Sequence, residues 1–295
     1  MTMSDSYNTI INQQSRWGAL YTPLKPKTEK KAGLRTVLFI SCNSGNLLFE
    51  NLVRFESLYP EKLNIIGIVT DDPVDPFARI SIKKRIWNQF LPEERKILFQ
   101  RTIDASIRIG VPCYSGAVKT DYFREIFYKW NPEALLMFCY GQIIDIAIYG
   151  YPVMGSYNFH PSDLQNKIGG GSQPFQNTIL NGSKTSVLVI HKVTDIVDVG
   201  PIVSVSPPSN ICLEEGSYPS SILSLDDKIT SVGGWMGVAL TDAIICKKEK
   251  GMTGHVDHVD IDRLMPETIK TILQKPVIDD LNEKYEVPLH PLLNK

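Results

Sequence analysis

The stretch Arg35–Leu58, "RTVLFISCNSGNLLFENLVRFESL", carries the pattern on which the expected fold rests. "RTVLFIS" is a short continuous apolar run, which is typical of a strand buried on both faces. The turn "SCNSGN" follows it, and "LLFENLVRFESL" then repeats apolar residues at helical spacing. We therefore predict a strand, a tight loop and a helix in this order.

The same alternation continues toward the C-terminus. Because strands that alternate with helices are typical of parallel sheets, we expect a mostly parallel sheet. Further strands are predicted in "LNIIGIVTDD" (63–72), "VPCYS" (111–115), "EALLMFCYG" (133–141) and "GSYNFH" (155–160), and helices in "LPEERKILFQRTIDASIRIG" (91–110), "KTDYFREIFYKWNP" (119–132), "PFQNTILNG" (174–182) and 223–247.

The later part of the chain predicts an antiparallel end to this sheet. "TSVLVIHKV" (185–193) and "PIVSVS" (201–206) are strand-like runs separated by Asp-Val-Gly-Pro. The expected fold class is α/β, a Rossmann-like open and mostly parallel sheet with helices on both faces and an antiparallel strand toward the C-terminal end. Residues 1–34 are expected to be an N-terminal arm or linker, 35–250 the main domain and 251–295 a C-terminal tail.

Composition and charge exclude several classes of protein. The 31 basic and 32 acidic residues give a formal net charge of -1, so we expect no nucleic-acid partner. The five cysteines contain no C-x-x-C pair, and no metal site is expected. The longest uninterrupted apolar stretch, Ala134–Tyr140, is far shorter than the roughly 20 residues that span a bilayer. A cytoplasmic protein without a membrane partner is the expectation, and a homodimer is left open.

Asn158 and His160 are the first residues whose spacing indicates chemistry. They lie two apart on a predicted strand, so both side chains leave the same face. An amide and a protonated imidazole can both donate hydrogen bonds to a carbonyl oxygen that gains negative charge. Asp198, in the loop before a later strand, could orient the imidazole. The alternatives are a histidine satisfied by backbone at a strand end and an ordinary Asp-x-Gly-Pro turn.

These segments together resemble a known family. Asn-x-His-Pro-Ser, a glycine-rich loop with a helix ending in Asn-Gly, and Val-Thr-Asp-x-x-Asp-x-Gly-Pro-Ile are similar to the 10-formyltetrahydrofolate-dependent formyltransferases, most closely the glycinamide ribonucleotide formyltransferase type. The resemblance runs in order from about Arg35 to Ser206 and more loosely to about Lys247. It identifies 35–250 as a formyltransferase catalytic domain. "FISCNSGNL" also resembles the strand and loop that hold a substrate phosphate on backbone N–H groups in that family.

The resemblance implies a role for each candidate residue. The amine acceptor would attack the formyl carbon, the oxyanion would be held by His160 and Asn158, and Asp198 would stabilise the imidazolium and help relay protons. Asp195 matches the first Asp of the family pattern and is the rival carboxylate. Catalytic residues are expected to be Asn158, His160 and Asp198; the folate pocket would be formed by the 140–144 and 193–199 segments, with Tyr140, Gln142, Ile143, Ile144, Val193 and Val197; acceptor binding would fall to Asn43, Ser44, Gly45 and Asn46.

Two of these assignments have purely structural alternatives. Ile143 and Ile144 could be plain core, and Ser44–Asn46 could be an ordinary strand-to-helix turn with Asn near the helix start. The loop Ser162–Gly171 also departs from the family pattern, because Asp163 and Gln165 replace the usual Leu and Pro and extra glycines follow.

The expected function is transfer of a formyl group from 10-formyltetrahydrofolate to a primary amine of a small metabolite. The acceptor would be phosphorylated and ribosyl-glycinamide-like, or a nucleotide-linked amino sugar. One alternative is a hydrolase of the same folate; such hydrolases usually carry a larger N-terminal regulatory domain than residues 1–34 offer, so transfer is favoured. Another is a catalytically altered module that binds a folate or nucleotide, which the changed 162–171 loop motivates.

Overall fold

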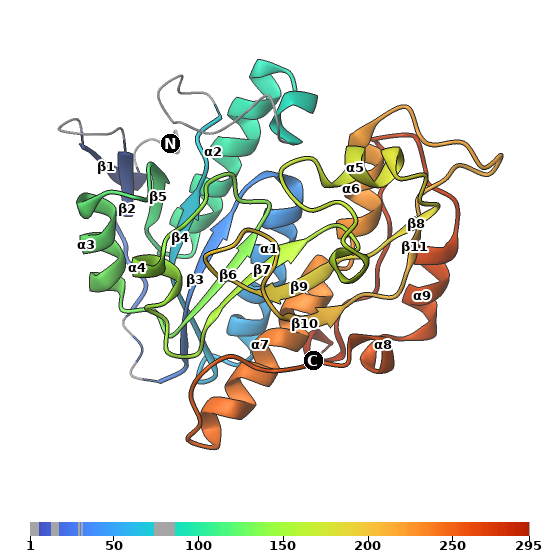
Figure 1. The fold of residues 1–295 in the computed structure, drawn as a ribbon. Coiled ribbons are helices and arrows are strands. Elements are labelled where there is room, and N and C mark those ends of the chain that lie inside the picture. Colours follow the sequence, from blue (N-terminus) through green and yellow to red (C-terminus); the bar gives the residue numbers. More distant parts are fainter. Residues whose placement is uncertain (1–5, 13–17, 29, 31, 74–85, 295) are drawn as a thin grey trace.

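A computed structural model describes residues 6–12, 18–28, 30, 32–73 and 86–294 of the chain. Among these residues, nine strands form one mixed sheet in the order β1-β2-β5-β4-β3-β6-β7-β9-β10 (Figure 1). The strands are β1 Tyr7–Asn12, β2 Gly18–Pro23, β3 Leu34–Ile40, β4 Leu63–Thr70, β5 Cys113–Gly116, β6 Ala134–Phe138, β7 Ser156–His160, β9 Val189–Lys192 and β10 Ile202–Val205, and β8 Thr185–Ser186 pairs separately with β11 Ser209–Asn210.

The centre of the sheet is parallel and both of its sides end in antiparallel pairs. Strands β5, β4, β3, β6 and β7 are parallel neighbours. On one side β7, β9 and β10 pair antiparallel, and on the other side β5, β2 and β1 do so. The predicted mostly parallel sheet with an antiparallel C-terminal end is therefore confirmed.

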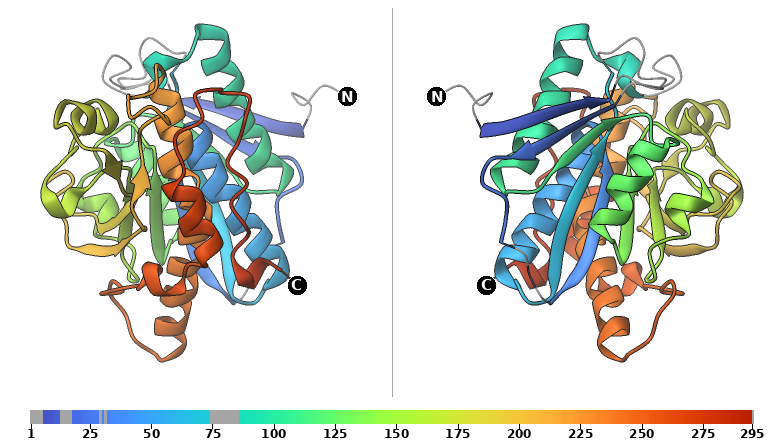
Figure 2. Two further views of the ribbon diagram at one scale, coloured as in Figure 1. Left: turned by 90° about the vertical axis from the view of Figure 1, so that its right-hand side faces the viewer. Right: turned by 90° about the vertical axis from the view of Figure 1, so that its left-hand side faces the viewer.

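Helices cover both faces of the sheet, as expected for buried parallel strands. Leu38 and Ile40 of β3 belong to the core beneath α1 and α7, whereas Val37 and Phe39 point to the opposite face, beneath α3. Figure 2 shows α1 and α3 on opposite sides of the sheet. The helices are α1 Cys42–Leu58, α2 Pro92–Arg108, α3 Asp121–Trp130, α4 Ile146–Tyr149, α5 Pro174–Leu180, α6 Ile222–Thr230, α7 Gly233–Glu249, α8 Ile261–Leu264 and α9 Glu267–Gln274, with short 3-10 turns η3 Ile86–Gln89, η4 Leu164–Asn166 and η5 Pro291–Leu293.

The N-terminal segment expected to be an arm or linker instead adds two strands to the sheet. β1 and β2 form an antiparallel pair, and β2 lies along the free edge of β5, with Leu20 opposite Tyr114. Ala19 is buried there. An unpaired sheet edge is costly, and this pair covers it. The polar composition of the segment gave no sign of this, because strands at an edge need few apolar residues. Residues 13–17 of the same expected arm lie outside the described residues.

The C-terminal part packs onto the helical layer above α1. The predicted 223–247 helix is divided into α6 and α7, and the tail contributes fully buried Ile269 and Leu273 from α9. Within the described residues, Ile222–Glu249 is the one helical stretch whose length and composition would suit a membrane span, and 78% of its apolar window is buried inside the fold. It therefore behaves as a core element.

Candidate functional site

The predicted catalytic residues lie around one cavity beyond the carboxyl ends of the parallel strands. The cavity has a volume of about 470 Å³. Asn158, His160 and Asp198 all line it. Ligand sites of open α/β sheets commonly occupy this position, because loops from neighbouring strands converge there.

Asn158 is held by a histidine on the neighbouring strand. The antiparallel register of β7 and β9 puts Asn158 opposite His191. The Nδ1 atom of His191 lies 3.0 Å from the Lys192 carbonyl oxygen, to which it donates. When the ring is neutral, its Nε2 accepts from Nδ2 of Asn158 at 3.1 Å. Since an amide has two N–H groups, this bond orients Asn158 and leaves one donor for another partner.

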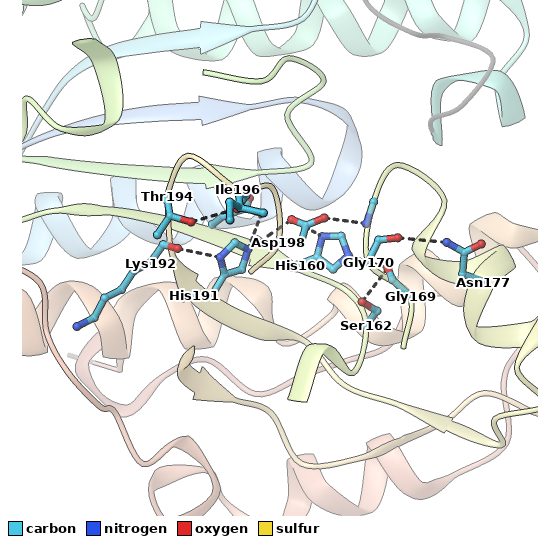
Figure 3. Close-up of polar contacts among 12 residues, drawn as sticks. His160, Ser162, Gly169, Gly170, Asn177, His191, Lys192, Thr194, Ile196 and Asp198 are labelled. Carbon is cyan, nitrogen blue, oxygen red and sulfur yellow. Dashed lines mark hydrogen bonds and ion pairs between the residues drawn. The ribbon is translucent and has the colours of Figure 1, made fainter. Parts of the chain in front are cut away.

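The carboxylate of Asp198 lies between two imidazole rings (Figure 3). Its Oδ1 is 3.5 Å from Nδ1 of His160 and 3.6 Å from Nε2 of His191. The N–H of Gly171 donates to its Oδ2 at 2.8 Å. Burial by itself raises the pKa of Asp198, but the hydrogen bond from a protonated His191, the His160 charge and the Gly171 N–H outweigh burial and hold the pKa below its ordinary value. Asp198 is therefore ionised at neutral pH.

The altered glycine-rich loop belongs to the site. The carbonyl oxygen of Gly169 accepts from Nε2 of His160 at 2.9 Å and from the Ser162 hydroxyl at 3.0 Å. Because a carbonyl can only accept, Nε2 of His160 carries a proton, and Nδ1, which faces Asp198, is the nitrogen that can gain or release one. Gly169 has φ +75°, and a Cβ there would lie 2.5 Å from the Cβ of Ser162. The glycine thus lets the backbone approach the histidine.

Sequence reasoning missed three contributors to this arrangement, which are His191, the Gly169 carbonyl and the Gly171 N–H. Alternation along "TSVLVIHKV" could have placed His191 on a face of its strand. Its position opposite Asn158 follows from strand register, which no local pattern contains. The two glycine contacts are made by backbone, so residue identity gave only the flexibility of the loop.

All the residues expected to form the folate pocket line the same cavity, where Gln142 is fixed by its bonds to the Gly116 carbonyl at 2.7 Å and to the Tyr140 hydroxyl at 3.0 Å. Ile144 is 6% exposed, in keeping with a core position. Ile143 and Val197 are 56% and 49% exposed, so the plain-core alternative does not hold for Ile143. The residues concerned are Tyr140, Gln142, Ile143, Ile144, Val193 and Val197.

The segment Asn43–Asn46, expected to bind the acceptor, lies at the start of a helix. Helix α1 begins at Cys42, so Asn43–Asn46 form its first turn, and only Ser44 among them lines the cavity. The Gly45 N–H already donates to the Ser41 carbonyl at 3.1 Å. The Asn46 amide donates to the Cys42 carbonyl at 2.8 Å and so caps the turn internally. Gly45 and Asn46 thus make the contacts of an ordinary strand-to-helix turn. The side-chain oxygen of Asn43 accepts a hydrogen bond from Arg101 at 3.5 Å.

Comparisons with known proteins concern the sequence and the fold. No protein-family model matches the chain. The methionyl-tRNA formyltransferase of Thermotoga neapolitana is 28% identical over 141 residues, which are 48% of this chain and 40% of that protein. That of Dictyoglomus turgidum is 30% identical over 145 residues, 48% of this chain and 41% of that protein. The chain thus spans less than half the length of these curated relatives.

Solved structures show the same fold. The phosphoribosylglycinamide formyltransferase from Anaplasma phagocytophilum superposes with a TM-score of 0.50 and 16% identity over 75% of this chain and 93% of that one. At 16% identity this similarity shows the fold alone. The relatives found by sequence are named methionyl-tRNA formyltransferases. This chain is thus similar in sequence to methionyl-tRNA formyltransferases over about half of its length, and it shares the fold of a phosphoribosylglycinamide formyltransferase.

Proposed function

We propose that this protein transfers a formyl group from 10-formyltetrahydrofolate to a primary amine. The observation that carries the proposal is the Asp198 carboxylate between His160 and His191, with Asn158 oriented on the same cavity wall. Such a set can hold a developing oxyanion and move protons around it.

The chain's own residues would act as follows. The free N–H of Asn158 and a protonated Nδ1 of His160 would donate to the formyl oxygen as the acceptor amine attacks. Asp198 would stabilise the imidazolium at 3.5 Å and accept protons in transit from the amine to the leaving nitrogen. The bond between the acceptor nitrogen and the formyl carbon forms, and the bond from that carbon to the folate nitrogen breaks.

The lining on one side of the cavity fits the formyl donor. Tyr140, Ile144 and Val193 offer apolar surface, and Gln142 offers amide hydrogen bonds beside them. Binding sites for flat heterocycles typically combine apolar walls with a few fixed polar groups. When bound, the donor would supply the one-carbon carbonyl.

The acceptor has two candidate classes. We propose a small amine-bearing molecule, because the net charge of -1 gives no general attraction for nucleic acid. The relatives named methionyl-tRNA formyltransferase favour methionyl-tRNA as the alternative acceptor, and the expectation of no nucleic-acid partner therefore has to be tested directly.

The experiment follows loss of the formyl group from 10-formyltetrahydrofolate with the wild type and with His160→Ala. Reactions contain no acceptor, a panel of small amines, or methionyl-tRNA. Amine-dependent turnover that His160→Ala abolishes supports the proposal, and turnover restricted to methionyl-tRNA selects the alternative acceptor. Turnover without any acceptor indicates hydrolysis, and folate binding without turnover indicates a binding module; either result refutes transfer.

A further inference from the structure

Part of the cavity lining comes from α1, α5 and α6 or lies next to them. We call this the inner end. It is lined by Ser44, Cys139, Phe175, Gln176, Asp226 and Thr230. Four of them, Phe175, Gln176, Asp226 and Thr230, come from α5 and α6, which carry none of the residues assigned to the folate pocket, so we assign this part of the cavity to the acceptor.

Asp226 is an unusual residue for this place. It sits in the middle of α6 and is 3% exposed; its backbone carbonyl accepts from the Thr230 hydroxyl, and among the described residues its carboxyl has no hydrogen-bond partner. The Ser44 hydroxyl at the same end is also buried without a described partner. Because buried polar groups in folded proteins are nearly always hydrogen-bonded, two unpartnered groups on one cavity wall indicate a ligand that satisfies them.

The electrostatics of the inner end disfavour an anion. Among the described residues that line the cavity there is no lysine or arginine. Lys284 is paired with Asp227, and Arg101 is paired with Glu50 at 2.7 Å on the surface. Burial raises the pKa of Asp226, the nearby Cys139 and Asp227 add to this, and Lys284 opposes it only in part. Among the described lining residues, a phosphate would meet the Asp226 carboxyl without a lysine or arginine to balance it, whereas a hydroxyl or ammonium group would supply the missing donors.

We propose that Asp226 and Ser44 bind the acceptor substrate through a hydroxyl or ammonium group and select against a phosphate at the inner end. This inference rests on the proposed function and deepens it. It differs from the expectation of a phosphorylated acceptor held by Asn43–Asn46, of which only Ser44 lines the cavity.

The test uses two probes that differ only by a phosphate, glucosamine and glucosamine 6-phosphate. Their binding to the full chain is measured by titration calorimetry at neutral pH, for the wild type, Asp226→Leu and Asp227→Asn. Leucine has the same number of side-chain heavy atoms as aspartate, with the same branching, but cannot accept a hydrogen bond. Asp227 neighbours Asp226 on α6 and does not line the cavity, so Asp227→Asn is the matched control.

We expect the wild type and Asp227→Asn to bind glucosamine at least about 10-fold more tightly than its phosphate ester, and Asp226→Leu to lose about 10- to 100-fold of the glucosamine affinity. The melting temperature of Asp226→Leu should equal or exceed that of the wild type, because an unsatisfied buried carboxyl is removed. A structural role for Asp226 would instead lower it.

Three results would overturn the inference: equal or tighter binding of the phosphate ester, binding of neither probe, or unchanged glucosamine affinity in Asp226→Leu. The proposed function fails separately, when no acceptor supports loss of the formyl group. Selective glucosamine binding without turnover would thus uphold the inner end and refute formyl transfer. Turnover that favours phosphorylated acceptors would support formyl transfer and refute the inference about the inner end.

Discussion

Replacing Asp198 by asparagine should remove most of the activity while leaving the fold and folate binding in place. The carboxylate is 3.5 Å from Nδ1 of His160, and the attraction between unit charges at this distance is about 5 kcal/mol at an effective dielectric constant of 20. Desolvation of the buried carboxylate offsets part of this. We expect a loss of about 3 to 4 kcal/mol in transition-state stabilisation, which corresponds to about a 10²- to 10³-fold fall in kcat/KM.

Asparagine is the suitable replacement for two reasons. Asp198 has φ +57°, a left-handed conformation that asparagine tolerates better than most residues. The amide oxygen can also keep the hydrogen bond from the Gly171 N–H. The matched control is Asp195→Asn, which removes an exposed carboxylate from the same loop. The assay compares kcat/KM for formyl loss, folate affinity and melting temperature across the three proteins.

The reasoning is refuted if Asp198→Asn retains activity within about threefold of the wild type, since a charge between two imidazoles would then contribute under about 1 kcal/mol. An equal loss in Asp195→Asn would also contradict it, because that carboxylate contacts neither ring. Because the pKa of Asp198 lies below its ordinary value, its ionisation stabilises the fold above the unfolded-state pKa and this contribution is lost as the pH falls through the folded-state pKa. Asp198→Asn should lack this acid-dependent part of the unfolding free energy.

Three further outcomes can be measured. Gly169→Ala should lower kcat more than folate affinity, because a Cβ 2.5 Å from a neighbouring Cβ must displace the carbonyl that holds His160; steady-state kinetics with folate titration checks this. Burial beside Trp235 lowers the pKa of His290 to about 4. Because the unfolded chain therefore takes up the proton first, the free energy of unfolding keeps its full His290 contribution above about pH 6.5 and loses it as the pH falls toward 4. Urea unfolding at pH 7.5 and 5 should show a loss of about 1 to 2 kcal/mol that His290→Asn lacks. Lys228→Met should cost about 1 to 3 kcal/mol at pH 7, because the buried ammonium donates to two backbone carbonyls near the end of α9 that would lose their partner; urea unfolding that shows no cost would contradict this account.

Most of the central sheet could be predicted because the sequence pattern of each of its strands is local. The apolar runs that became β3, β4 and β6 are buried on both faces, and helical spacing marks α2 and α3. β1 and β2 could not be predicted in the same way. β2 pairs along β5, which lies about ninety residues away in sequence, and β1 pairs with β2, so neither strand needs the continuous apolar run that marks a central strand.

The residues of the site likewise fall into those that a local sequence pattern reveals and those that only tertiary contacts bring together. By itself, the sequence determined that Asn158 and His160 leave one face of a strand, since side chains alternate with a period of two, and that Asp198 follows in a turn toward the next strand. The tertiary structure decided that His191 lies opposite Asn158, that Gly169 and Gly171 hold His160 and Asp198 by backbone, and that Asp226 reaches the same cavity from α6. Register, backbone contacts and helix packing join residues distant in the chain, and local periodicity carries no information about such contacts.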